Sequence, residues 1–251
     1  MSGFREAVAL LTRIPVASAS CRPSDISSSV AWFPVVGAGV GAAVGGVYVG
    51  LSELVPELAA AGVALAVGLL LTGGLHEDGL ADAADALGAS SQRHALEVMR
   101  DPRHGTFGVA AGSLSVLIRA GAISALGGWS ALGSVVAAHA LSRGAAVGLL
   151  AHLRPAEADG LGSVYAGGLS RRGAASGYAA ATILGAAGLG ILVAPAAVIT
   201  TLAAVVTGAV AGSRFGGMTG DVLGAAQQLA ETGILLLVAG LTTAGLQIPA
   251  W

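Results

Sequence analysis

The sequence predicts an all-α protein, a polytopic integral membrane helical bundle. Of its 251 residues, 55% are hydrophobic and only 10% are charged, whereas about 25% of the residues in an ordinary soluble domain are charged. The mean hydropathy is +0.81. A soluble domain would need a charged surface that this composition cannot supply, and a disordered chain would be polar and rich in charge. Both of these classes are therefore excluded.

A helix crosses a bilayer when about 20 consecutive residues are largely apolar, and the chain contains about seven such segments. They cover residues 34–52, 58–75, 106–127, 131–151, 175–193, 196–212 and 232–249. The fifth and sixth share a stretch, 173–213, that has no Asp, Glu, Lys or Arg and is divided at Pro195, where a helix would break. If one of these two is a re-entrant segment, the C-terminus changes sides. We treat residues 1–251 as a single membrane domain.

Two local patterns predict how helices pack around the first span. Gly37, Gly41 and Gly45 recur every fourth residue, a spacing that lets a second helix approach closely in lipid. The N-terminal segment before this span fits an amphipathic helix at the membrane surface, with Arg5 and Arg13 directed toward water.

The arginines predict the orientation, because cytoplasmic loops collect basic residues. With seven spans, the segment before the first span and three of the connections share one side. They carry Arg5, Arg13, Arg22, Arg93, Arg100, Arg103, Arg154, Arg171, Arg172 and Arg214. The opposite turns lack arginine, and the first of them carries Glu53 and Glu57. We therefore expect a multi-pass protein of the cell (inner) membrane with a cytoplasmic N-terminus and cytoplasmic catalytic loops over about 76–106 and 213–231.

The first of these loops begins with a group of acidic residues. Residues 76–104 read HEDGLADAADALGASSQRHALEVMRDPRH. In a helix, Asp78, Asp82 and Asp85 would share one face, where like charges repel, and no basic residue follows before Arg93. A divalent cation would turn this repulsion into attraction, and oxygen ligands suit Mg²⁺ or Mn²⁺. We predict a metal site at the membrane surface. The alternative is a solvated cytoplasmic helix, in which bases would balance the acids.

The second half of the same loop is basic and rich in glycine. It contains Arg100, Arg103, His104, Gly105, Thr106 and Gly108, directly before the third span. Arginines beside the free N–H groups of a helix N-terminus make a phosphate-binding site. The alternative is a topology anchor followed by a helix cap.

The second loop places one acid in a glycine-rich turn. Residues 213–231 read SRFGGMTGDVLGAAQQLAE, and a helix is expected to follow Asp221. Asp221 is either an N-cap or, if it faces the acidic stripe formed by Asp78, Asp82 and Asp85, a further metal ligand. Acids that hold a divalent metal beside arginines at a membrane surface are typical of phosphoryl transfer.

Three segments together resemble the cobalamin synthase family, the adenosylcobinamide-GDP ribazoletransferases. They are GGLHEDGLADAADALG (73–88), MRDPRHGTFG (99–108) and GGMTGDVLGA (216–225). The N-terminal FREAVALLTRIPV and the following AWFPVVGAGVG are also similar, so the resemblance covers nearly the whole chain. It implies that α-ribazole or α-ribazole phosphate is joined to adenosylcobinamide-GDP. GMP leaves, adenosylcobalamin or its phosphate forms, and Mg²⁺ is required.

The resemblance also implies roles for individual residues. Asp78, Asp82 and Asp85 would hold Mg²⁺ against the pyrophosphate, and Asp221 would complete the site or orient the ribose hydroxyl. The phosphate-binding group would be Arg100, Arg103, Arg214 and Thr106. Glu77, where the family often has an apolar residue, would lie behind the ligands. The general base stays open among His76, His104 and an acid of the stripe, Asp78 or Asp82.

Two other functions remain as alternatives. A CDP-alcohol phosphotransferase has a similar acidic motif, but the arginine of that motif is absent and Asp82 stands in its place. A secondary transporter would explain ionisable groups inside spans, here Arg119, His139 and Arg143, but transporter sites lie at the midplane and the acids cluster at one surface. The expected partners are adenosylcobinamide-GDP, α-ribazole or its phosphate, and the lipid bilayer. No nucleic acid is expected, and a homo-oligomer or association with other cobalamin-assembly enzymes stays open.

Overall fold

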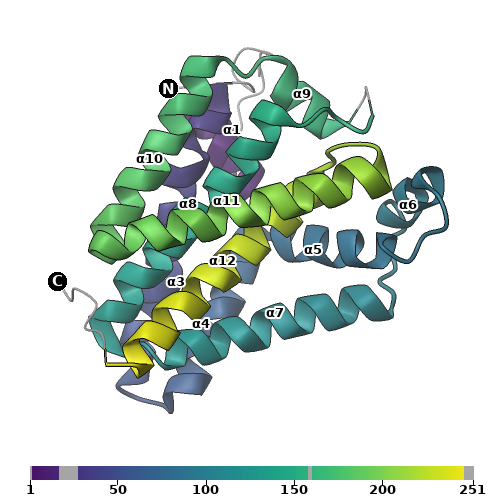
Figure 1. Cartoon of the computed structure of the whole chain (residues 1–251). Helices are drawn as coiled ribbons and strands as arrows, with labels where there is room; N and C mark the ends of the chain where they lie inside the picture. The colour runs from purple at the N-terminus through teal and green to yellow at the C-terminus, as the bar shows by residue number, and fades with distance from the viewer. Residues whose placement is uncertain (1, 17–27, 158–159, 246–251) are drawn as a thin grey trace.

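The structure, a computed structural model, describes residues 2–16, 28–157 and 160–245. Arg22 and the predicted end of the seventh span, 246–249, lie outside these residues. The elements are α1 (Ser2–Leu11), η1 (Val30–Trp32), α3 (Phe33–Ser52), α4 (Glu57–Thr72), α5 (Leu75–Ala86), α6 (Gln92–Met99), α7 (Thr106–Ser124), α8 (Gly128–His152), α9 (Leu161–Gly167), α10 (Arg171–Leu189), η2 (Gly190–Leu192), α11 (Val193–Val210), η3 (Ala211–Phe215) and α12 (Gly220–Thr243). Every regular element among the described residues is helical, which confirms the all-α prediction (Figure 1).

Five helical stretches are long and apolar enough to cross a membrane. They are Val30–Ser52, Thr106–Ser124, Gly128–His152, Arg171–Phe215 and Gly220–Thr243. The pair α4 and α5, bent by 90°, would add a sixth. Arg171–Phe215 holds both the fifth and the sixth predicted span, as α10 and α11, which Figure 1 shows as the two arms of a V. The membrane character is confirmed, whereas the count of seven and the side of the N-terminus stay predictions.

Helix α8 forms the centre of the bundle and packs against α3, α10, α11 and α12. Its contact with α3 runs along the glycines of the first span. A Cβ atom on Gly37 would lie 2.5 Å from the His139 carbonyl oxygen, and one on Gly41 would lie 2.9 Å from the Val135 carbonyl oxygen. The glycine spacing in the sequence therefore marks a close helix contact, as predicted.

The acidic helix α5 turns away from α4 at two glycines. Gly73 and Gly74 both have a φ of 70°, a left-handed conformation that glycine adopts without strain. The N–H of Gly73 donates to the Leu69 carbonyl and closes α4. After this bend α5 packs against α12 and α7, and Figure 1 shows it at one end of the bundle, beside the short helix α6. Helix α5 lies outside the five spanning stretches.

Helix α12 begins at Gly220, earlier than the seventh span predicted from residue 232. Most of the predicted loop over 213–231 is therefore helix. The turn before α12 is tied to the polar segment after α8, because Met218 N donates to the Arg154 carbonyl at 2.8 Å and Ala156 N donates to the Met218 carbonyl at 2.9 Å.

The N-terminal helix α1 is amphipathic, as predicted. Ala7 and Leu11 are buried, whereas Arg5 and Arg13 are exposed. The chain after α1 is fixed to the end of α4, because Arg13 N donates to the Leu71 carbonyl at 2.8 Å. Helix α1 thus covers the side of the bundle on which the bend into α5 lies.

Candidate active site

Two aspartates of α5 and one histidine from the loop before α7 form an acidic cluster. The distance from Asp78 Oδ1 to His104 Nε2 is 3.4 Å, and the distance from Asp82 Oδ1 to His104 Nδ1 is also 3.4 Å. One ligand atom from each of the three side chains lies within 4.8 Å of the other two. The helical stripe and the basic segment predicted from the sequence therefore meet, and the cluster can hold a metal ion.

Electrostatics support a cation at this cluster. The side chain of Asp82 is 12% exposed and that of Asp78 is 62% exposed. Burial, together with the negative charges of Asp78 and Asp221, raises the pKa of Asp82 to about 6. A divalent cation would offset this repulsion. The two carboxylates supply the oxygen ligands that suit Mg²⁺ or Mn²⁺, whereas the imidazole nitrogen of His104 is a ligand that transition metals prefer.

Asp221 approaches the cluster through a backbone contact between α5 and α12. A Cβ atom on Gly79 would lie 3.0 Å from Asp221 Cα and 3.3 Å from Gly224 Cα. The N-cap of α12 is Thr219, whose Oγ1 accepts the N–H of Val222 at 3.2 Å. The alternative that Asp221 serves as the N-cap is therefore wrong. Its carboxylate accepts the hydroxyl of Thr219 at 3.4 Å and borders both cavities described below.

Asp85 takes a different position from the other two aspartates of the stripe. Its carboxylate accepts the N–H of Gly105 at 2.6 Å and the N–H of Gly108 at 2.9 Å. Asp85 therefore occupies two of the N–H groups at the start of α7 that were predicted from the sequence to bind a phosphate. The structure does not bring Asp85 into the cluster of Asp78, Asp82 and His104.

The arginines predicted to bind phosphate all have protein partners in the structure. Arg100 forms an ion pair with Glu157, and Arg103 binds Asp101 through Nε at 2.9 Å and Nη2 at 2.6 Å. Arg214 Nη2 donates to the backbone carbonyls at 87 and 89, at 2.8 and 3.3 Å, and so fixes η3 to the end of α5. Thr106 is exposed at the start of α7.

Two cavities meet at Asp221. The first, of about 230 Å³, is bordered by Arg100, Glu157 and Thr219. The second, of about 180 Å³, is bordered by His76 and Asp78 of α5 and by apolar side chains of α1 and α3. Gly162, Gly220 and Asp221 line both. Two ligands could therefore approach one carboxylate from different sides.

A buried ionic network lies behind α5 and includes a residue that the sequence reasoning missed. Glu231, with no exposed surface, pairs with Arg119 at 2.9 Å, Arg143 at 3.1 Å and His139 at 3.2 Å. Arg119 also pairs with Glu77 at 2.9 Å. The sequence did contain a signal for Glu231. Arg119 and Arg143 both lie within predicted spans, and arginines inside a membrane pair with acidic side chains.

This network accounts for the ionisable groups that suggested a transporter. Two arginines face two glutamates, so the formal charges of these four side chains cancel. The cavity between them measures only about 10 Å³. Glu77, expected behind the ligands, belongs to this network: its carboxylate accepts from Arg119 and from the Gln228 amide, at 2.9 and 3.0 Å.

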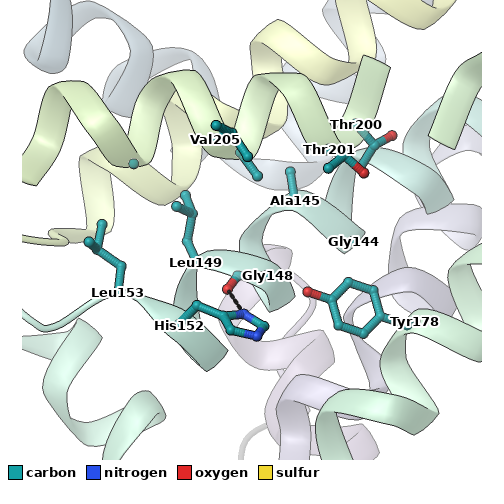
Figure 2. A pocket seen from close by; sticks show the side chains of 12 residues that line it. Gly144, Ala145, Gly148, Leu149, His152, Leu153, Tyr178, Thr200, Thr201 and Val205 are labelled. Atoms are coloured by element: carbon teal, nitrogen blue, oxygen red, sulfur yellow. Dashed lines mark hydrogen bonds between the residues drawn. The ribbon is translucent and has the colours of Figure 1, made fainter. Parts of the chain in front are cut away.

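A larger cavity of about 350 Å³ lies between α8, α10 and α11, away from these residues (Figure 2). Tyr178 and His152 flank it, and no acid or arginine lines it. It contains none of the predicted site residues, so the cavities beside Asp221 remain the candidate active site.

Comparisons with known proteins show the family to which the chain belongs. Residues 3–239 match the family model for cobalamin-5-phosphate synthase. An adenosylcobinamide-GDP ribazoletransferase of Bradyrhizobium diazoefficiens is 38% identical over 247 residues, which cover 95% of this chain and 94% of that protein. The protein of the same name from Escherichia coli is 37% identical over 245 residues, covering 93% and 97%. No solved structure gives a significant match. The chain belongs to the cobalamin-5-phosphate synthase family.

Proposed function

We propose that the protein transfers the adenosylcobinamide phosphate moiety from adenosylcobinamide-GDP to α-ribazole or α-ribazole phosphate, with release of GMP. The relatives are named for this transfer. The observation that carries the proposal is the convergence of Asp78, Asp82 and His104 beside Asp221, where two cavities meet. The product would be adenosylcobalamin or its phosphate.

The transfer needs one bond to form and one to break. A ribose hydroxyl oxygen of the acceptor bonds to the phosphorus that carries the cobinamide. The bond from that phosphorus to the bridging oxygen breaks, and GMP takes the bridging oxygen with it. The hydroxyl proton goes to a group at the junction of the cavities. Asp221 and His76 both border the second cavity, whereas His104 belongs to the acidic cluster.

The carboxylates of Asp78 and Asp82 would hold Mg²⁺, with Asp221 and His104 beside them. The raised pKa of Asp82 and the crowding of like charges fit a cation at this position. When bound, the ion would neutralise the pyrophosphate and the charge that develops on the departing GMP.

Arg100 would bind a phosphate of the donor. It borders the first cavity together with Thr219 and Gly220. Its side chain is 63% exposed in the ion pair with Glu157, and an exposed pair contributes little free energy. Exchanging Glu157 for a substrate phosphate would therefore cost little.

The decisive measurement is GMP release from adenosylcobinamide-GDP and α-ribazole by purified protein, with and without Mg²⁺. We expect release only when both substrates and Mg²⁺ are present. GMP release in the presence of a chelator and without Mg²⁺ would show that the reaction does not need the metal. Absence of GMP release under every condition would reject the proposed function.

We further propose that the protein lies in the cytoplasmic membrane with this site on the cytoplasmic face. The distribution of arginines supports this orientation. Cys21, the single cysteine of the sequence, is first replaced by alanine. Cysteines introduced at positions 93 and 171 should then resist an impermeant thiol reagent in intact cells, whereas one introduced at position 53 should react. Labelling of position 171 from outside would show that the span count is wrong.

A further inference from the structure

We propose that the cavity of about 180 Å³ beside Asp78 and Asp221 is the pocket for the aromatic base of the acceptor nucleoside, and that Gln227 donates the hydrogen bond that selects this base. The inference rests on the proposed function, because it assigns one of the two substrates to one of the two cavities.

The walls of the cavity suit a flat apolar group. Leu10 and Leu11 of α1, Phe33 of α3 and Leu223 of α12 line it, and the carboxylates of Asp78 and Asp221 lie along its border. A pocket of this kind takes up an apolar ring system and fixes its orientation through a few polar groups. Its volume admits a two-ring base but not a corrinoid macrocycle.

The cavity is also bordered by two buried donors that lack a partner. Gln227 is 1% exposed and Arg143 is 2% exposed, and both line the cavity. Gln227 Nε2 and Arg143 Nε have no hydrogen-bond partner among the described residues. A buried donor without a partner costs free energy. Each of these nitrogens is itself buried, so the Gln227 amide would turn toward the cavity to meet an acceptor atom of a ligand there.

A benzimidazole base, the base of ribazole, has this combination of properties. It consists of two fused apolar rings, one ring nitrogen carries the ribose, and the other ring nitrogen is a single hydrogen-bond acceptor. Guanine, the base of the donor, carries polar groups around most of its edge, and those that face the leucine and phenylalanine side of the cavity would lose their hydrogen bonds to water without replacement. The chemistry of the cavity therefore favours the acceptor over the donor.

The position of the cavity also indicates how the two substrates would be arranged for the reaction. With the base inside, the ribose would extend toward Asp221, which borders both cavities. The donor pyrophosphate would approach from the cavity that contains Arg100. The two reacting groups would then meet between Asp221 and the acidic cluster.

The test is equilibrium binding of two probes to the purified full-length protein. One probe is α-ribazole and the other is the riboside of 5,6-dimethylindole, in which a C–H group replaces the acceptor nitrogen. The wild type should bind α-ribazole about three- to tenfold more tightly, as expected for one neutral hydrogen bond. In Gln227→Leu this preference should disappear, whereas the Kd for GMP should not change. Thr200→Val, which alters a buried polar residue of α11 bonded to the Ala196 carbonyl, should keep the preference.

Equal binding of the two probes by the wild type would overturn the assignment without requiring any variant to fold. An unchanged preference in Gln227→Leu would likewise reject Gln227 as the donor. Failure of the proposed function would show differently, as absence of GMP release by a wild type that still distinguishes the two probes.

Discussion

Gly79 of α5 and Gly224 of α12 lie in backbone contact, and a Cβ atom on Gly79 would be 3.3 Å from Gly224 Cα and 3.0 Å from Asp221 Cα. This contact sets the distance between the acidic helix and Asp221. Gly79→Ala should separate the two helices and lower kcat/KM for the Mg²⁺-dependent reaction roughly tenfold or more, since misplaced reacting groups lose rate steeply. Gly62→Ala is the control, because no atom lies within 4 Å of its added Cβ. Equal activity of the two variants would show that this contact does not position the site.

Asp82→Asn should abolish turnover but leave a folded, membrane-inserted protein. The amide keeps the shape of the side chain but removes a ligand charge from the acidic cluster, so Mg²⁺ should bind more weakly. GMP release is measured over a Mg²⁺ titration at matched protein levels, with Asp101→Asn as the control. A solvated helix without a metal would instead gain stability when a repelling charge is lost.

The same titration for Asp221→Asn tests whether α12 contributes to the same site. We expect a comparable loss, because Asp221 lies against Gly79, next to Asp78 in the chain. Normal activity of Asp221→Asn together with an inactive Asp82→Asn would confine the metal site to α5 and His104.

Asp85→Asn should behave differently from Asp82→Asn. Asp85 accepts two N–H groups at the start of α7, so loss of its charge should lower the free energy of unfolding by about 1 kcal/mol. The affinity for Mg²⁺ should stay close to that of the wild type. Thermal unfolding in detergent and a Mg²⁺ titration separate the two effects, and a large loss of Mg²⁺ affinity would return Asp85 to the ligand set.

Arg100→Ala should raise KM for adenosylcobinamide-GDP about ten- to a hundredfold, the effect of removing a charge-assisted hydrogen bond. KM for α-ribazole should change little, because Arg100 borders only the first of the two cavities. Arg93→Ala is the control, since Arg93 pairs only with Glu97 at the surface. An unchanged KM would leave Arg100 as a topology anchor.

Glu231→Gln should destabilise the fold by about 3–5 kcal/mol, because Arg119 and Arg143 would keep their charges in the interior with too little compensation. Glu97→Gln, at an exposed pair, should cost less than about 1 kcal/mol. Chemical unfolding of both variants in the same detergent makes the comparison. Equal stability would mean that the buried network contributes nothing to the bundle.

The sequence predicts the apolar helices and the acidic stripe because both depend on local periodicity. It does not predict which acid meets which partner. Asp85 shares a helix face with Asp78, yet it lies two turns further along α5 and reaches the start of α7. The loop that carries His104 is brought to the stripe only by tertiary packing. The expected loop over 213–231 includes Glu231, and only the folded structure supplies Arg119, Arg143 and His139, the partners that allow this acid to be buried.

Neighbouring carboxylates of α5 face opposite environments. Glu77 is bound to Arg119 inside the bundle, whereas Asp78 belongs to the acidic cluster at the surface. Successive residues of a helix are about 100° apart, so α5 cannot rotate about its axis to move Asp78 without breaking the ion pair of Glu77. The interior of the bundle thus fixes the rotation of the helix that carries the surface site, and a change in the packing of α7 would reach the acidic cluster through the ion pair of Glu77 with Arg119 as well as through Asp85.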